Sequence, residues 1–118
     1  MNRVAMRTRR DAPALLLGSL EEQVMLSVIR TGEEAYGMNV RRELESVTGR
    51  EITIGSVYAT LDRLEAKGLV TSGRTAGSDT ASRRVFAVTP AGARSLAQTR
   101  ATRDRLWTGV NLRDLLDS

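Results

Sequence analysis

The first half of the chain contains three short segments with the apolar spacing of amphipathic helices, and each is followed by a glycine. We expect these helices over Ser19–Arg30, about Tyr36–Val47 and about Gly55–Lys67. Gly32, Gly49 and Gly68 follow within two residues, and glycine readily takes the left-handed conformation in which helices commonly end. Because only about five residues separate the second helix from the third, these two helices must cross at an angle.

Each expected helix has one apolar stripe, formed by residues three or four positions apart, that can pack against the other helices. The stripes consist of Leu20, Val24 and Met25, widened by Leu26, Val28 and Ile29, in the first helix, of Val40, Leu44 and Val47 in the second, and of Val57, Leu61 and Leu64 in the third. Together they predict one shared hydrophobic core and a mostly α-helical fold.

Polar residues mark where the helices begin. Ser19 and Glu22 are three residues apart and predict a capping box, in which each side chain accepts a hydrogen bond from a backbone N–H at the helix start. Thr53 is the expected N-cap of the third helix. Thr89 and Pro90 predict the start of a fourth helix, because proline there lacks only an N–H that has no helical partner.

A β-hairpin is expected between the third and fourth helices. Leu69–Gly73 and Ser82–Val88 have the pattern of short strands, with Phe86 and Val88 on one face. The segment Arg74–Ala81 between them is rich in small and polar residues and is the expected exposed tip. The chain after this hairpin carries apolar residues in the fourth helix and in a last turn, which are Leu96, Leu106, Trp107, Val110, Leu112, Leu115 and Leu116.

The order helix, helix, helix, hairpin, helix is that of a winged helix-turn-helix with a C-terminal helix, an α+β fold that is mostly α. One helix of such a unit fits the major groove of DNA, and the hairpin contacts the neighbouring backbone or minor groove. We therefore divide the chain into a flexible basic arm (1–13), a DNA-binding winged helix-turn-helix domain (14–89) and a C-terminal dimerisation helix (90–118). The arm either reaches DNA or is only a solvated tail.

Composition narrows the function further. The chain has no cysteine and no histidine, which removes thiolate and imidazole catalysis and most transition-metal sites. We therefore expect no enzyme, no cofactor and no metal site. Because no apolar run approaches the ~20 residues of a membrane span, we expect a cytoplasmic protein without a membrane partner. The formal net charge of +4 favours an anionic partner.

The outer face of the expected third helix has the composition of a DNA-reading helix. The residues that point away from its apolar stripe are Ser56, Ala59, Thr60, Arg63 and Lys67. Small side chains allow close approach to base edges, and arginine can hold guanine or phosphate through two hydrogen bonds. Taken alone, this face could equally be an ordinary solvated one. The hairpin adds Arg74, Arg83 and Arg84, which favours DNA.

Several blocks of the sequence resemble the PadR family of transcriptional regulators, over about residues 15–97. The blocks are Tyr36-Gly37, Gly55-Ser56-Val57-Tyr58 with Leu61 to Val70, Arg83-Arg84-Val85-Phe86, Val88-Thr89 and Gly92. Ala59 stands where the family often has proline, and Phe86 where tyrosine is common. The short C-terminal part resembles the compact branch of the family, which has a single final helix.

The resemblance implies a homodimer, held by the first and last helices, that binds a palindromic operator in duplex DNA and usually represses. The two recognition helices would then lie ~34 Å apart. It also implies that Tyr36, Tyr58 and the wing arginines lie close to DNA, although Tyr58 flanks the core stripe and could equally be a packed tyrosine. The competing hypothesis is a winged-helix module that binds another protein and has no specific DNA target.

The resemblance further implies a small aromatic or lipophilic effector, bound at the dimer interface. The residues that could line such a pocket or interface are Leu96, Arg103, Leu106, Trp107 and Val110. Trp107 is the only tryptophan of the chain. Its simpler interpretation is a dimer anchor, because tryptophan is enriched at interfaces in general.

Overall fold

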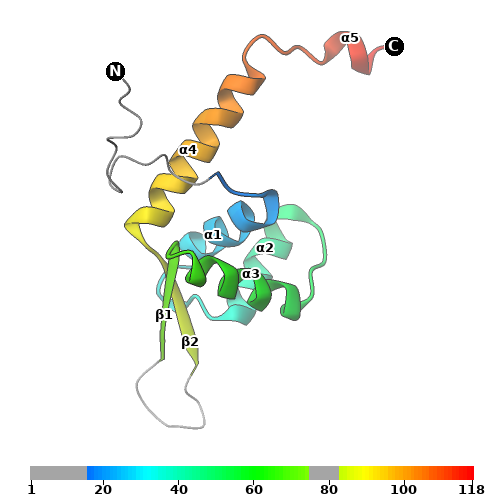
Figure 1. Cartoon of the computed structure of the whole chain (residues 1–118). Helices are drawn as coiled ribbons and strands as arrows, with labels where there is room; N and C mark the ends of the chain where they lie inside the picture. Colours follow the sequence, from blue (N-terminus) through cyan, green and yellow to red (C-terminus); the bar gives the residue numbers. More distant parts are fainter. Residues whose placement is uncertain (1–15, 75–82) are drawn as a thin grey trace, which may run out of the picture.

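Helices predominate in the computed structural model, which describes residues 16–74 and 83–118 (Figure 1). The elements in chain order are α1 (Ser19–Thr31), the 3-10 helix η3 (Gly32–Glu34), α2 (Gly37–Thr48), α3 (Ile54–Ala66), β1 (Val70–Arg74), β2 (Arg84–Val88), α4 (Pro90–Trp107) and α5 (Arg113–Leu116). This order confirms the predicted fold class. The expected basic arm (1–13) and most of the expected hairpin tip lie outside the described residues.

One hydrophobic core lies between α1, α2, α3 and the root of the hairpin. Its buried members are Val24, Met25, Val28, Ala35, Val40, Leu44, Val57, Leu61, Leu64, Leu69, Val70 and Phe86. Three predictions about the stripes are wrong, because Leu26 and Ile29 lie on the outer side of α1 and are exposed. Val47 is exposed as well, since it lies in the last turn of α2, beyond the final buried residue of that helix.

The predicted starts of α3 and α4 are confirmed. At α3, Oγ1 of Thr53 accepts a hydrogen bond of 3.0 Å from the N–H of Ser56. At α4, Oγ1 of Thr89 accepts one of 3.0 Å from the N–H of Gly92, and Pro90 is the first residue of the helix. Both caps satisfy backbone donors that have no partner within the helix.

The predicted capping box of α1 is wrong by one residue. Gly18, not Ser19, is the N-cap, and its N–H donates to Oε1 of Glu21 at 3.1 Å. The carboxylate half of the box is therefore present, but a glycine supplies the cap. Because Glu21 closes this first turn, Glu22 can face α4 instead.

The two strands of the hairpin pair antiparallel, with Val70 opposite Val88. The root of the hairpin is also tied to the segment before α2. The N–H of Phe86 donates to the carbonyl oxygen of Ala35 at 3.0 Å, and Tyr36 forms an antiparallel bridge with β2. These contacts fix the wing beside the start of α2.

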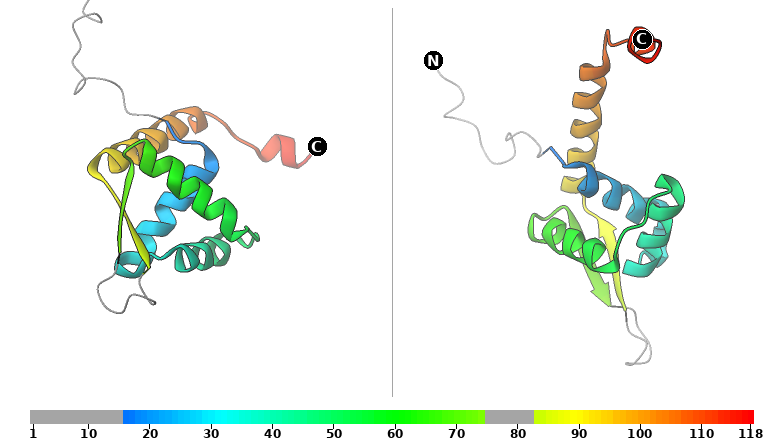
Figure 2. Two further views of the ribbon diagram at one scale, coloured as in Figure 1. Left: turned by 60° about the horizontal axis from the view of Figure 1, so that its bottom comes forward. Right: turned by 90° about the vertical axis from the view of Figure 1, so that its right-hand side faces the viewer.

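Helix α4 starts at the root of the hairpin and projects away from the helical domain (Figure 2). Its first turn packs closely because Gly92 has no side chain, since a Cβ there would overlap the carbonyl oxygen of Leu69. The helix ends at Trp107, and Gly109 then takes a left-handed conformation with φ of 80°. Val110 thus lies beyond the helix that was expected to contain it, and α5 forms the predicted last turn.

Candidate nucleic-acid interface

The outward side of α3 carries most of the residues that the sequence predicts there. The exposed ones are Ser56, Ala59, Arg63 and Lys67. Thr60 is only 1% exposed, so the prediction that it points outward is wrong. In a helix with about 3.6 residues per turn, Thr60 lies three residues after Val57 and four before Leu64, and it therefore shares their buried side.

Thr60 instead positions Arg63. Its hydroxyl oxygen accepts a hydrogen bond from Nη2 of Arg63 at 3.3 Å. The guanidinium group has five N–H donors, so this contact leaves others available on the exposed side of the helix. The result is a cation held on the exposed surface of α3, in the last turn of the helix.

Lys67, just after the last residue of α3, joins this helix to α1. Its Nζ lies 2.7 Å from Oε2 of Glu21. The hydrogen bond from Lys67 lowers the pKa of Glu21 from its ordinary value; partial burial opposes this shift, and the N–H of Gly18 adds to it. Because a carboxylate compensates its charge, Lys67 has a structural role whether or not it contacts DNA.

Tyr58 extends from α3 over the start of α2. A Cβ at position 37 would overlap the ring of Tyr58, so Gly37 provides the space in which this ring lies. The ring also lies near Phe86, with centroids 6.5 Å apart and planes tilted by 56°. Tyr58 is 36% exposed. It is therefore a packed residue with one accessible edge, and its contact with DNA stays a prediction.

Arg84 on the wing faces α3. Its Nη1 lies 3.2 Å from Oδ1 of Asp62 and its Nη2 lies 2.8 Å from Oε1 of Glu65. Its guanidinium also lies 4.8 Å from the ring centroid of Phe86. Glu65 accepts a further hydrogen bond of 2.8 Å from Oγ of Ser72 on β1. One carboxylate of α3 therefore holds both strands of the wing.

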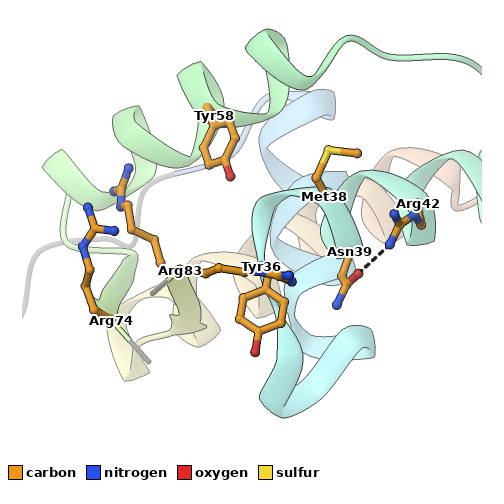
Figure 3. Close-up of a pocket in the computed structure, with 8 residues that line it drawn as sticks. Tyr36, Met38, Asn39, Arg42, Tyr58, Arg74 and Arg83 are labelled. Atoms are coloured by element: carbon orange, nitrogen blue, oxygen red, sulfur yellow. Dashed lines mark hydrogen bonds between the residues drawn. The ribbon is translucent and has the colours of Figure 1, made fainter. Parts of the chain in front are cut away.

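A cleft of about 440 Å³ lies between the start of α2, α3 and the wing (Figure 3). Four arginines, two tyrosines, a methionine and an asparagine line it, namely Arg42, Arg74, Arg83, Arg84, Tyr36, Tyr58, Met38 and Asn39. No carboxylate is among these lining residues. The guanidinium of Arg83 lies 4.8 Å from the ring centroid of Tyr36. The cleft thus brings together Tyr36, Tyr58 and the three wing arginines that the sequence predicts near DNA.

The chemistry available at this cleft is the binding of an anion, because its charged lining residues are all arginines.

Within residues 16–74 and 83–118, no three acidic side chains come together as they would to hold a metal ion. In the same residues, no helix has the length and apolar composition to cross a membrane.

Arg103 of α4 forms an ion pair with Glu22 of α1. Its Nη1 lies 2.5 and 2.6 Å from the two carboxylate oxygens, and the hydrogen bonds to Glu22 raise the pKa of Arg103. Both residues line two shallow hollows between α1 and α4, with volumes of about 230 and 420 Å³. Leu106 lines the smaller hollow and Leu96 the larger.

The apolar residues at the end of α4 and just after it are open to solvent. Leu106 is 72% exposed, Trp107 54% and Val110 50%. Trp107 and Val110 line neither hollow between α1 and α4. The five residues expected to form an effector pocket or dimer interface are therefore not gathered into one pocket of the single chain.

The transcriptional regulator PadR-like family matches residues 25–98, from the first half of α1 through the wing into α4. The chain belongs to this family. Its members are transcriptional regulators rather than enzymes, in agreement with the composition. No curated protein matches the chain.

Solved structures of PadR regulators share the fold of this PadR-like chain. A PadR-like transcriptional regulator from Bacillus cereus strain ATCC 14579 has a TM-score of 0.64 and 23% identity, over 84% of this chain and 92% of that one. A regulator from Eggerthella lenta DSM 2243 has a TM-score of 0.62 and 28% identity, over 84% and 88%. One from Clostridium difficile R20291 has a TM-score of 0.65 and 17% identity, over 83% and 99%. These similarities confirm the winged-helix fold.

Sequence reasoning missed three residues of the cleft in this PadR-like chain, since it gives no role to Met38, Asn39 or Arg42. All three lie in the first two turns of α2 and line the cleft. The signal that could have found them is Tyr36-Gly37 directly before them. A glycine at a helix start allows another element to approach the helix closely, as the ring of Tyr58 does at Gly37. Residues in the first two turns of α2 then lie beside that element.

Proposed function

We propose that this chain is a transcriptional repressor that binds a palindromic operator in duplex DNA as a homodimer. The observation that carries the proposal is the exposed face of α3, where Ser56, Ala59 and Arg63 lie beside an arginine-lined cleft without a carboxylate. Small side chains leave room for base edges, and the arginines attract the phosphate backbone. Membership of the PadR-like family supports the same conclusion.

Exposed apolar side chains on α1 and α4 support the homodimer. They are Leu26, Ile29, Leu106 and Trp107. Apolar side chains that gather on a projecting helix are typical of an interface, where tryptophan is enriched. A symmetric partner would present a second copy of α3, about 34 Å from the first, which matches the two halves of a palindrome. A cytoplasmic location follows for a protein that must reach the chromosome.

Duplex binding at several salt concentrations tests this proposal. The DNA upstream of the protein's own gene is expected to bind, with an affinity that falls by about one log unit per log unit of salt for each neutralised phosphate. Arg63→Ala is expected to lose about 1–3 kcal/mol of binding free energy if Arg63 contacts a base. The matched control is Arg94→Ala on the exposed side of α4, which should bind like the natural chain. Binding that is absent or indifferent to salt would favour a protein-interaction module instead.

A small planar effector at the dimer interface is a second candidate role, favoured by the half-exposed Trp107 next to Leu106. An aromatic or lipophilic compound would stack on the indole ring and release the repressor from DNA. Because Trp107 lines neither hollow of the single chain, a dimer anchor is the better supported role of this residue. Titration of planar compounds against tryptophan fluorescence separates the two roles. Unchanged emission across a broad panel would leave only the anchor.

A further inference from the structure

We infer that α5 of one copy of this chain docks in the larger hollow between α1 and α4 of a second copy, and that two copies exchange this segment reciprocally. The inference rests on the homodimer of the proposed function and names the element that each copy gives to the other. We call this hollow of about 420 Å³ the α1–α4 groove; its lining residues are Glu22, Leu26, Leu96, Ala97, Arg100 and Arg103.

Helix α5 has an apolar face that is exposed in the single chain. Leu112, Leu115 and Leu116 are three or four positions apart, so they share one side of this turn. Leu115 is 72% exposed and Leu116 79%. Leucines that gather on one side of a helix are typical of a surface that packs against another element.

By itself α5 is too short to be a stable helix. It has four residues, and isolated helices shorter than about 12 residues are at best marginally stable in water. Within the described residues, its hydrogen bonds stay inside the segment 111–118. The N–H of Leu116 donates to the carbonyl oxygen of Leu112 at 2.9 Å, for example, and the N–H of Arg113 to Oδ1 of Asn111 at 2.9 Å. A surface that covers the leucines would therefore stabilise this turn.

The α1–α4 groove offers apolar surface of the kind that these leucines need. Leu26, Leu96 and Ala97 form its apolar part. Leu26 lies on the outer side of α1 and is 42% exposed, so its side chain is not covered by the core of its own chain. Burial of leucines from α5 would remove apolar surface of both partners from water.

The charge of the α1–α4 groove favours an acidic occupant. Glu22 is compensated by Arg103, which forms an ion pair with it. Arg100 also lines the groove, and in the part of the chain that the structure describes it forms no ion pair with a carboxylate. The groove therefore carries one uncompensated positive charge.

The segment that contains α5 has the complementary charge. Asp114 and Asp117 outnumber Arg113, so residues 111–118 carry a net negative charge on their side chains. The end of α4 is the other exposed apolar segment that a second copy could offer. Its residues 100–107 contain three arginines and one aspartate, which would bring like charges together in the groove. Charge therefore favours α5 over the end of α4.

The position of α5 favours a second copy over its own chain. Figures 1 and 2 show α5 beyond the far end of α4, where that helix has left the helical domain. The groove lies farther back, where α4 runs beside α1. To reach it, α5 of the same chain would have to fold back over the end of α4. In a symmetric pair, one contact formed twice fills both grooves and closes the assembly, and exchange of an identical element is a low-cost route to dimers.

Disulfide cross-linking between two variants of the full-length protein tests the contact. The chain has no cysteine of its own, so one introduced pair reports one contact. Ala97→Cys places a thiol in the groove, and Leu116→Cys places one on α5. The two variants are mixed and equilibrated in a glutathione redox buffer, and linked peptides are identified by mass spectrometry. We expect a disulfide between position 97 of one variant and position 116 of the other.

Gln98→Cys is the matched control for the cross-link. Gln98 is the next residue of α4 and is exposed, but it does not line the groove. Mixed with Leu116→Cys, it is expected to give only background linkage. Equal linkage at positions 97 and 98 would show unspecific capture by a mobile segment and would overturn the inference.

The strength of the dimer provides a second measurement. A chain that carries both Leu115→Asn and Leu116→Asn is expected to have a dimer dissociation constant at least roughly tenfold higher than the natural chain, as measured by sedimentation. Because neither leucine belongs to the core, its helical domain should unfold at the same urea concentration. Val47→Asn, at an exposed position of α2, should leave the dissociation constant unchanged.

The remaining outcomes separate this inference from the proposed function. Linkage of position 97 to position 97 would place α4 against α4 and overturn the inference, while the homodimer would stand. A disulfide within a single chain that carries both cysteines would assign the groove to that chain's own α5, with the same consequence. A natural chain that stays monomeric and binds no duplex would contradict the proposed function itself.

Discussion

At Gly37, the absence of a side chain decides where Tyr58 can lie. The ring of Tyr58 occupies the place that a Cβ at position 37 would take, and it forms one wall of the cleft beside α3. Thr60 acts in a related way from inside the fold, because its buried hydroxyl holds the guanidinium of Arg63 at the surface. At the scale of single residues, Gly37 and Thr60 would not touch DNA themselves. They determine where Tyr58 and Arg63 lie on the proposed DNA-binding surface.

Gly37→Ala is expected to lower the free energy of unfolding by at most about 1 kcal/mol, because the added Cβ overlaps the far end of the Tyr58 ring and this half-exposed ring can move aside. Helix propensity alone would favour alanine. Chemical denaturation measures the change. The matched control is Gly55→Ala in the first turn of α3, where a Cβ makes only an ordinary contact with Thr53 and stability should not fall.

The overlap with Tyr58 can be checked separately. In a chain that carries Tyr58→Ala, the same change at position 37 should cost much less, because the obstacle is gone. An equal loss with and without the ring would contradict the steric explanation.

The ion pair of Glu21 predicts a pH dependence of stability. Because the pKa of Glu21 is lower in the folded chain than its ordinary value of 4.5, the pair with Lys67 stabilises the fold above that value, and this contribution disappears as the pH falls through the folded-state pKa. Glu21→Gln should therefore lower stability at neutral pH and lower it less at about pH 3. We expect less than about 1 kcal/mol, since Lys67 is 41% exposed and solvent screens the pair.

Urea denaturation of both chains across this range measures the difference. Glu33→Gln, at an exposed position of η3, is the control and should show no such trend. A difference between Glu21→Gln and the natural chain that stays constant with pH would contradict the role of the ion pair.

At the scale of elements, ion pairs connect the helices to one another and to the wing. Glu65 of α3 joins both strands of the wing through Arg84 and Ser72. The first turn of α1 makes two further connections, since Glu21 binds Lys67 after α3 and Glu22 binds Arg103 of α4. A few carboxylates at element junctions therefore add contacts between the recognition helix, the wing and α4, whose arrangement is set by the packing of the core.

Arg84→Ala is expected to weaken duplex binding by about 1 kcal/mol because the wing loses its attachment to α3. The slope of affinity against salt should not change, since Arg84 is already paired and would release no counterion. Glu65→Gln should weaken binding as well, although it removes a negative charge near the DNA. Binding measured for both variants at several salt concentrations decides between two roles of Arg84. Tighter binding by Glu65→Gln, or a slope reduced by about one in Arg84→Ala, would show that Arg84 holds a phosphate.

At the scale of the whole molecule, α4 separates two functions of the chain. Its first turns are anchored at the root of the wing through Gly92 and Thr89. Its last turns project away from the helical domain (Figure 2). Leu106 and Trp107 in these turns are exposed. The described chain therefore has an arginine-lined cleft at the wing and exposed apolar residues at the far end of α4, an arrangement that suits the proposed homodimer.

Trp107→Ala is expected to weaken the proposed homodimer by about 2 kcal/mol, or roughly thirtyfold in its dissociation constant, because a large interface anchor is lost. Sedimentation over a range of concentrations measures this constant. Val47→Ala is a suitable control, since Val47 is equally exposed but lies on α2. A natural chain that stays monomeric at high concentration would contradict the dimer.

Local signals in the sequence were sufficient to predict most elements of this fold. Thr53 and Thr89 cap helices because each interacts with a backbone N–H only three residues away. The stripe Val57, Leu61 and Leu64 is buried as predicted, because one face of a helix needs only the regular repeat of the backbone. The order of these elements then predicted a winged helix-turn-helix, and the family resemblance implied the same fold.

The sequence by itself determined where the helices and strands form and which sides of them are apolar, since these properties depend on neighbours within about one turn of the chain. Only the tertiary structure decided that Thr60 is buried, that Val47 is exposed, and that Arg84 pairs with Glu65, 19 residues away. It also decided that Arg42 of α2 lines the same cleft as Arg74 of the wing. Burial and ion pairing depend on which segments meet in space, and that arrangement is fixed by the packing of the whole core rather than by any local pattern.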